Sequence, residues 1–255
     1  MTAGWRLAAI LVAALVIVDS VGRAQERPLP ERDVLFAAVR DNLERADRDQ
    51  DLYAYKERRS DLHVNPFGSR LGTGGSSVYD VRPIAPGIWE RRLIERDGRL
   101  VTDSKPERQD RRSRRVSSAR SPIDDVVQAL ALTIARREQW RGRDAVVVTF
   151  VPRPNAKPET RQGKLAVNFE GEIWIDEQTS EVVRAQATAI DDLSFGWGMI
   201  ARLHKGTKTT LIRDTVVDDI WLPTSLRFVG EGRAMLFRKL TIDYTIAWFD
   251  YRKVL

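Results

Sequence analysis

The end of the chain alternates between apolar and polar residues, and this alternation is the strongest constraint on the fold. The apolar set is Leu236, Leu240, Ile242, Tyr244, Ile246 and Trp248, and the polar set is Lys239, Thr241, Asp243 and Thr245. A period of two is typical of a β-strand with one buried face. Ala234–Tyr251 is therefore predicted to form a long strand whose apolar face covers a core.

Similar strand signals recur along most of the sequence, so the chain is predicted to be mainly β. Further predicted strands occupy residues 52–64, 78–84, 88–95, 100–103, 133–140, 145–151, 171–176, 181–190, 208–217 and 221–229. The dipeptide Asp97-Gly98 predicts a tight hairpin, because glycine readily adopts the positive φ that such a turn needs. Consecutive antiparallel strands with one apolar face form a curved sheet.

Two amphipathic helices accompany the strands. Apolar residues recur at three-to-four spacing in Glu31–Arg48. A second helix is predicted to start at Ser121, before a proline and two acidic residues, with a loop at residues 152–162. Its predicted apolar positions are Val126, Val127, Leu130 and Leu132. The predicted fold class is mainly β with flanking helices (α+β): an open, incomplete antiparallel β-barrel, or curved sheet, with helices on its concave side.

The first 24 residues have the pattern of a secretory signal peptide. Arg6 precedes an apolar run from Leu7 to Val18, and Gly22-Arg23-Ala24 places small residues at a cleavage site. The run is too short to span a bilayer, which takes about 20 residues. We therefore expect residues 1–24 to be removed and residues 25–255 to form one domain in the periplasm. Since no cysteine follows Ala24, this domain is expected to be soluble and not lipid-anchored.

Composition narrows the set of partners. The chain has no cysteine, which excludes disulfides, thiol chemistry and Cys-based metal sites. Its formal net charge is +6, and outside the cytoplasm such a charge favours anionic lipid head groups or acidic polymers over nucleic acid. An Arg-rich segment at about 106–121 is expected to be mobile. Its candidates for contact with anionic surfaces, called the arginine cluster below, are Arg111, Arg112, Arg114 and Arg115.

No group of residues has the pattern of a catalytic site. Asp61 and His63 share one strand face but do not complete a metal site, and His204 is expected in a loop without an acidic neighbour. The adjacent acids Asp124-Asp125 indicate a helix start, and Gly72-Thr73-Gly74-Gly75 lacks the Lys-Ser/Thr ending of a phosphate loop. The protein is therefore predicted not to be an enzyme, with no catalytic residue, metal or cofactor.

Several short motifs occur in a characteristic order along the chain. They are the helix Glu31–Arg48 followed by Leu52–Glu57, then Val81-Arg82-Pro83, Trp89, Asp97–Leu100, and Gly171–Asp176 followed by Val182–Arg184. This order resembles the periplasmic lipoprotein-carrier superfamily, the outer-membrane lipoprotein-sorting proteins with a LolA/LolB-like fold. The resemblance implies an open half-barrel that carries acylated cargo, with Arg82 governing its retention and transfer. The Arg-rich segment and the loop at residues 152–162 depart from the pattern of the carriers.

These observations favour a soluble periplasmic protein that binds a lipid, an acyl chain or a lipoprotein, as a carrier or sorting protein. Besides Arg82, the residues predicted to contact the ligand are Trp89, Leu93, Ile242, Tyr244, Ile246 and Trp248. The envelope membrane surface is the expected transient partner. The alternative is a protein-interaction or envelope-stress sensing module of the same fold, which binds an envelope protein and transfers no lipid.

Overall fold

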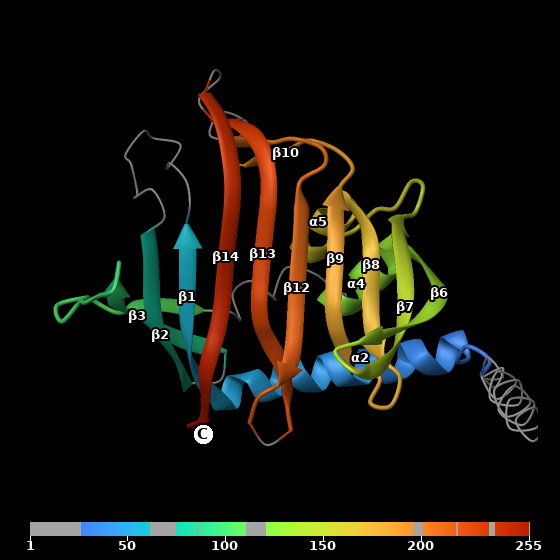
Figure 1. The fold of residues 1–255 in the computed structure, drawn as a ribbon, viewed down its shortest axis with the longest axis horizontal. Coiled ribbons are helices and arrows are strands. Elements are labelled where there is room, and N and C mark those ends of the chain that lie inside the picture. Colours follow the sequence, from blue (N-terminus) through green and yellow to red (C-terminus); the bar gives the residue numbers. More distant parts are fainter. Residues whose placement is uncertain are drawn as a thin grey trace, which may run out of the picture. The chain divides into compact units, whose positions relative to one another are not determined.

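One antiparallel sheet of 14 strands makes up most of the structure (Figure 1). The computed structural model describes residues 27–61, 75–85, 87–110, 121–195, 201–217, 219–234 and 238–254. The predicted signal peptide, the arginine cluster and His63 lie outside the described residues. The fold below is that of the unit Glu31–Leu255.

The strand order joins the two ends of this unit. The strands are β1 Tyr53–Asp61, β2 Gly75–Ala85, β3 Ile88–Arg96, β4 Arg99–Leu100, β5 Glu107–Asp110, β6 Leu130–Trp140, β7 Arg143–Pro152, β8 Phe169–Asp176, β9 Val182–Ala189, β10 Leu193–Phe195, β11 Ala201–Leu203, β12 Lys208–Thr215, β13 Trp221–Ala234 and β14 Arg238–Lys253. Their main order is β4-β3-β2-β1-β14-β13-β12-β9-β8-β7-β6. The first strand β1 thus pairs with the last strand β14, and β11 and β5 add to β13 and β3. Among the described residues β4 and β6 do not pair with each other, so the sheet is open.

Tight turns connect neighbouring strands of the sheet. Asp97 and Gly98, with φ of 51° and 76°, join β3 to β4. Arg141 and Gly142, with φ of 50° and 78°, join β6 to β7. Two consecutive positive φ angles give a turn whose twist matches that of the flanking strands. The predicted Asp97-Gly98 hairpin is confirmed.

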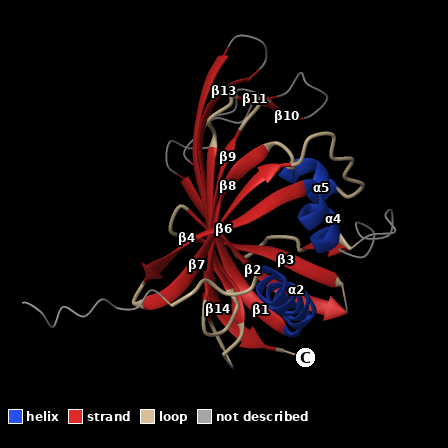
Figure 2. Cartoon of the chain, turned by 90° about the vertical axis from the view of Figure 1, so that its right-hand side faces the viewer, coloured by secondary structure: helices blue, strands red, loops and turns tan. Residues whose placement is uncertain are grey.

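The three α-helices of the described residues lie on one side of the sheet (Figure 2). They are α2 Arg32–Asp49, which continues into the 3₁₀ turn η1 Gln50–Leu52, then α4 Pro122–Ala129 and α5 Arg161–Ala166. The helices lie on the concave face, and α2 runs across one end of several strands (Figure 1). The predicted fold class, a mainly β open sheet with helices on its concave side, is confirmed.

Strand β7 is buried on both faces and forms the centre of the core. Val146 and Val148 point to the helices, where they pack with Leu35 of α2 and Ile175 of β8. Val147 points the other way and packs with tryptophans on the outer face. The outer face of this strand is therefore filled, whereas its inner face lies beneath the helices.

The end of α4 and the loop at residues 152–162 differ from their predictions. Leu130 and Leu132 are not part of the helix but begin β6, where Leu132 pairs with Phe150. Both leucines point to the same core because alternate residues of a strand share a face, so their apolar pattern did not distinguish helix from strand. The predicted loop at residues 152–162 ends in α5, a short helix that the sequence analysis missed.

Two polar segments also differ from their predictions. Glu107–Asp110 was expected to be part of a mobile segment, but it forms β5 and pairs with the first half of β3. This part of the β3 edge is available because the two-residue strand β4 pairs only with the end of β3. His204 was expected to lack an acidic neighbour, but its Nδ1 lies 3.5 Å from a carboxylate oxygen of Asp192. The backbone N–H of Lys205 donates to the same carboxylate, so a loop contact brings these residues together.

Candidate functional site

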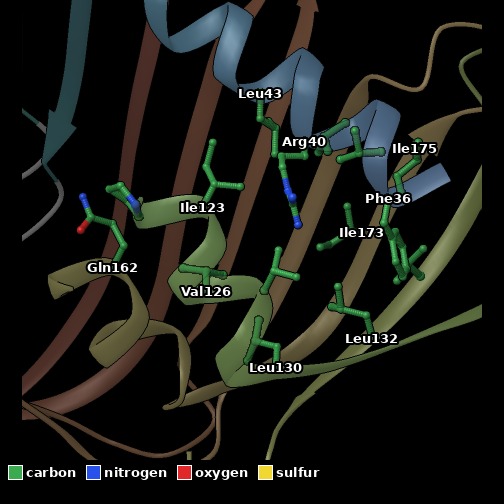
Figure 3. Close-up of a pocket in the computed structure, with 15 residues that line it drawn as sticks. Phe36, Arg40, Leu43, Ile123, Val126, Leu130, Leu132, Gln162, Ile173 and Ile175 are labelled. Atoms are coloured by element: carbon green, nitrogen blue, oxygen red, sulfur yellow. The ribbon is translucent and has the colours of Figure 1, made fainter. Parts of the chain in front are cut away.

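An apolar cavity of about 280 Å³ lies between α2, α4 and the concave face of the sheet (Figure 3). Thirteen of its fifteen lining residues are apolar. The lining consists of Phe36, Val39, Arg40, Leu43, Pro122, Ile123, Val126, Val127, Leu130, Leu132, Val148, Gln162, Ile173, Ile175 and Val182. Ligand sites are usually concave, mostly apolar and supplied with a few polar groups, and this cavity meets that description.

Helix α2 contributes one stripe of side chains to the cavity. Phe36, Arg40 and Leu43 follow i, i+4 and i+7 spacing, so they share a helix face with the neighbouring Val39. On the same helix, Leu35 is buried against the sheet and ties α2 to the core. The sequence predicts this helix and its apolar spacing, but nothing in the pattern assigns the stripe to a ligand.

A buried residue in the second half of α2 fixes this helix. Asn42 donates from its side-chain amide to the carbonyl of Thr179 in the β8–β9 turn, at 2.8 Å. That turn is held by Asp176, which accepts from both the N–H and the hydroxyl of Thr179 and from the guanidinium of Arg143. Burial opposes the charge of Asp176, but the Arg143 and Thr179 hydrogen bonds outweigh it and lower the pKa of this carboxyl. The turn is therefore a charged anchor for α2.

Helix α4 begins with a side-chain cap. The Ser121 hydroxyl accepts from the N–H of Asp124 at 3.1 Å, and Pro122 occupies the first turn. The helix then places Ile123 and Val126 over the cavity (Figure 3). The predicted cap at Ser121 is confirmed, and it sets where the helical wall of the cavity starts.

Asp125 joins α4 to α5 and to the loop before it. Its side chain is 1% exposed and accepts from the N–H of Glu159 and from the N–H and hydroxyl of Thr160. Thr160 in turn caps α5 by accepting from the N–H of Gly163. A Cβ at Gly163 would lie 2.1 Å from the Asp125 carboxylate, so only glycine fits there. The two helices therefore form one unit beside the cavity.

Arg40 is the single charged side chain of the lining, and it lies where α2 and α4 meet. Its Nε is 3.3 Å from a carboxylate oxygen of Asp124, and the two side chains are 48% and 36% exposed. Figure 3 shows its guanidinium directed between Ile123 and Ile173. The cavity thus has apolar walls and a cation at an exposed edge.

The apolar residues that the sequence predicts to contact a ligand lie elsewhere on the sheet. Trp89 and Leu93 belong to β3, and Tyr244, Ile246 and Trp248 belong to β14. The strand register places them on one face, since Trp248 is opposite Glu57, Ile246 is opposite Arg59 and Leu93 is opposite Tyr79. Ile242 pairs with Gly230, and its side chain lies outside the described residues. None of these residues lines the cavity between α2 and α4.

This second region of the sheet is packed around charged groups. Trp89 is 1% exposed and donates from its indole N–H to Asp51, directly after α2. Trp248 donates to the buried carboxylate of Glu57, which also accepts from Arg59. The guanidinium of Arg91 stacks 3.5 Å from the ring of Tyr79 and pairs with Glu57. The register thus places most of the predicted residues on one face, where Trp248 contacts the ion pairs of Glu57 with Arg59 and Arg91.

Arg82 lies on the opposite face of the sheet. Its neighbours Val81 and Pro83 are buried, whereas the Arg82 side chain is half exposed and pairs with Glu90 across β2 and β3. The arginine cluster lies outside the described residues.

Two further findings concern the described part of the chain. No cluster of three or more His, Cys, Asp or Glu side chains with a metal-binding arrangement is found among these residues. None of the helices that the structure describes has the length and apolar character needed to cross a membrane.

An open antiparallel sheet with helices on its concave face defines the class of half-barrel folds. No family model matches the chain, and no curated protein matches it. A LolA superfamily protein from Nitrosomonas europaea matches at 11% identity and a TM-score of 0.38, over 85% of this chain and 94% of that chain. A putative outer membrane lipoprotein-sorting protein domain from Vibrio parahaemolyticus matches at 11% identity and a TM-score of 0.37, over 86% and 93%.

A third structure, the MucA/MucB complex of Pseudomonas aeruginosa, matches at 10% identity and a TM-score of 0.26, over 86% of this chain and 99% of that chain. Structures of the superfamily that the sequence motifs resemble are thus among those that match, at low identity.

Proposed function

We propose that the protein binds an acyl chain in the cavity between α2, α4 and the sheet, and that it acts as a binding or carrier protein of the cell envelope. The observation that supports this proposal is the lining, in which thirteen of fifteen residues are apolar. The proposed activity needs no chemical step.

The energetics of burial favour an apolar ligand. Each methylene group removed from water contributes about 0.8 kcal/mol, so ten of them contribute about 8 kcal/mol before the cost of immobilising the ligand. A gross energy of this size supports affinities up to the micromolar range. The cavity of about 280 Å³ lies at the lower end of ligand sites, which span roughly 300 to 1,000 Å³. A single chain therefore suits it better than a ligand with several chains.

The proposed location in the periplasm rests on the signal-peptide pattern of residues 1–24. In that compartment an acyl chain has to cross water, and an apolar cavity shields it. The arginine cluster is proposed to bring the protein to anionic membrane surfaces, where such a chain is loaded or released.

The test is a titration of the purified protein with the neutral fluorophore N-phenyl-1-naphthylamine, followed by displacement with decanol. We expect the fluorescence to rise on binding and to fall as decanol competes, because both ligands are apolar and carry no charge. Native mass spectrometry of protein isolated from the envelope should also show a bound lipid. A protein that binds neither fluorophore nor decanol would refute the proposal.

A further inference from the structure

We infer that the cavity selects single-chain amphiphiles with a carboxylate head group, and that Arg40 binds this head group. The inference rests on the proposed function, since it specifies which acyl ligand the same cavity accepts. It starts from the one cation among fifteen lining residues, which include no acidic side chain.

The position of Arg40 suits a head group rather than a tail. The side chain is 48% exposed, so the charged end of a ligand bound there remains in contact with water. The other walls of the cavity are apolar and include Ile173 of β8 and Val126 of α4 (Figure 3). A ligand bound with its tail among these walls would place its head group at Arg40.

The chemistry of the side chain favours a carboxylate. A guanidinium presents its N–H groups in a planar fork that matches the two oxygens of a carboxylate. In the structure Arg40 already pairs with a carboxylate, that of Asp124, through its Nε at 3.3 Å. Because both side chains are partly exposed, this ion pair is weak and exchangeable. A ligand carboxylate can replace Asp124 or share the guanidinium with it.

The volume limits the length of the chain. An apolar cavity of about 150 Å³ holds one benzene ring. By that measure, the cavity of about 280 Å³ holds roughly ten to twelve carbon atoms. Decanoate is therefore the probe of choice, and decanol is its neutral counterpart with the same chain.

The experiment compares the dissociation constants of decanoate and decanol for four forms of the full protein at pH 8: the unchanged chain, Arg40→Gln, Asp124→Asn and Arg48→Gln. Arg40→Gln should weaken decanoate binding about tenfold, which corresponds to about 1.4 kcal/mol, and leave decanol binding unchanged. Asp124→Asn should strengthen decanoate binding because it removes the competing carboxylate. Arg48→Gln, on an exposed position of the same helix, should change neither constant.

The outcomes separate the inference from the proposed function. If no form binds either probe, both the proposed function and the inference fail. If the unchanged protein binds both probes and Arg40→Gln weakens them equally, or weakens neither, the inference alone is wrong. Circular dichroism checks that Arg40→Gln is folded, and Arg40→Lys, which keeps the charge, should retain part of the decanoate affinity.

Discussion

Filling the cavity should stabilise the protein and weaken ligand binding, and Val126→Phe is the substitution that tests this. Val126 lines the cavity from α4 and is partly exposed. A cavity of about 150 Å³ holds a benzene ring, so the space of about 280 Å³ accepts the larger side chain. At roughly 0.8 kcal/mol for each added carbon, full burial of the added carbons would raise the free energy of unfolding by up to about 3 kcal/mol, and half burial would raise it by about 1.5 kcal/mol.

Val147→Phe is the matched control. Val147 lies on β7 with 0% exposure and points to the outer face, where it packs with Trp174 and Val183. Because this side of the strand is filled, the same enlargement forces neighbours apart and should destabilise the protein by about 1–3 kcal/mol. The two variants thus share their chemistry and differ in the space around the side chain.

Urea unfolding followed by circular dichroism measures the free energy of unfolding, and the decanol titration measures binding. Thermal unfolding gives a second measure of the same change. For a chain of this size, each kcal/mol of unfolding free energy changes Tm by about 2–4 °C, so opposite shifts for the two variants are easily resolved. We expect Val126→Phe to raise the free energy of unfolding and to weaken decanol binding. If Val126→Phe destabilises the protein as much as Val147→Phe, the space in the cavity is not available. If decanol affinity does not change, the ligand binds elsewhere.

Three further predictions concern buried charges and the membrane. Arg213 is buried and donates to Glu181, so Arg213→Met should lower the free energy of unfolding by about 3–5 kcal/mol in urea denaturation, with most of the loss recovered when Glu181→Leu is added. The pKa of Asp176 is lowered in the folded protein, so its contribution to the free energy of unfolding is present above about pH 4 and is lost as the pH falls through the folded pKa. In a series of unfolding curves at different pH, Asp176→Asn should flatten this acid dependence. An unchanged dependence would contradict the assignment. Replacing the arginine cluster with glutamine should weaken cosedimentation with anionic vesicles, because each arginine near the surface contributes about 1 kcal/mol. The effect should be clearest at low salt, where charges are screened least. Equal binding of both forms would refute the proposed membrane contact.

Local signals account for most of the strands. The alternation in Ala234–Tyr251 predicts a strand that corresponds to β14, although Ala234 itself ends β13. The Asp97-Gly98 turn is where a glycine with positive φ was expected. These local signals fail where the same spacing of apolar residues fits both a helix and a strand. Leu130 and Leu132 satisfied a helical period as well as an alternating one, and only the pairing of β6 with β7 decides between them. A six-residue helix such as α5 is too short for periodicity to reveal.

The candidate site was less accessible to sequence reasoning than the fold. The alternation of apolar and polar residues gave the correct face of the sheet for residues such as Trp248, because alternate residues of a strand point to the same side. It could not show which part of that face the helices cover, since this depends on contacts between distant residues. Asn42 reaches Thr179 across 137 positions, and Asp125 reaches Thr160 across 35. A charged residue within the apolar stripe of α2 was the one available signal for Arg40.

The anchors of the helices indicate where the proposed ligand would enter. Helix α2 is held at Asn42, and α4 is held to α5 at Asp125, both through buried hydrogen bonds. Where the two helices meet above the cavity, Arg40 and Asp124 form an exposed ion pair, and such pairs contribute only about 0–1 kcal/mol. Separating the helices at this point breaks a weak contact and leaves both anchors in place. A chain that enters there tail first ends with its head group at the entrance, beside Arg40, so the entry route and the proposed head-group site coincide.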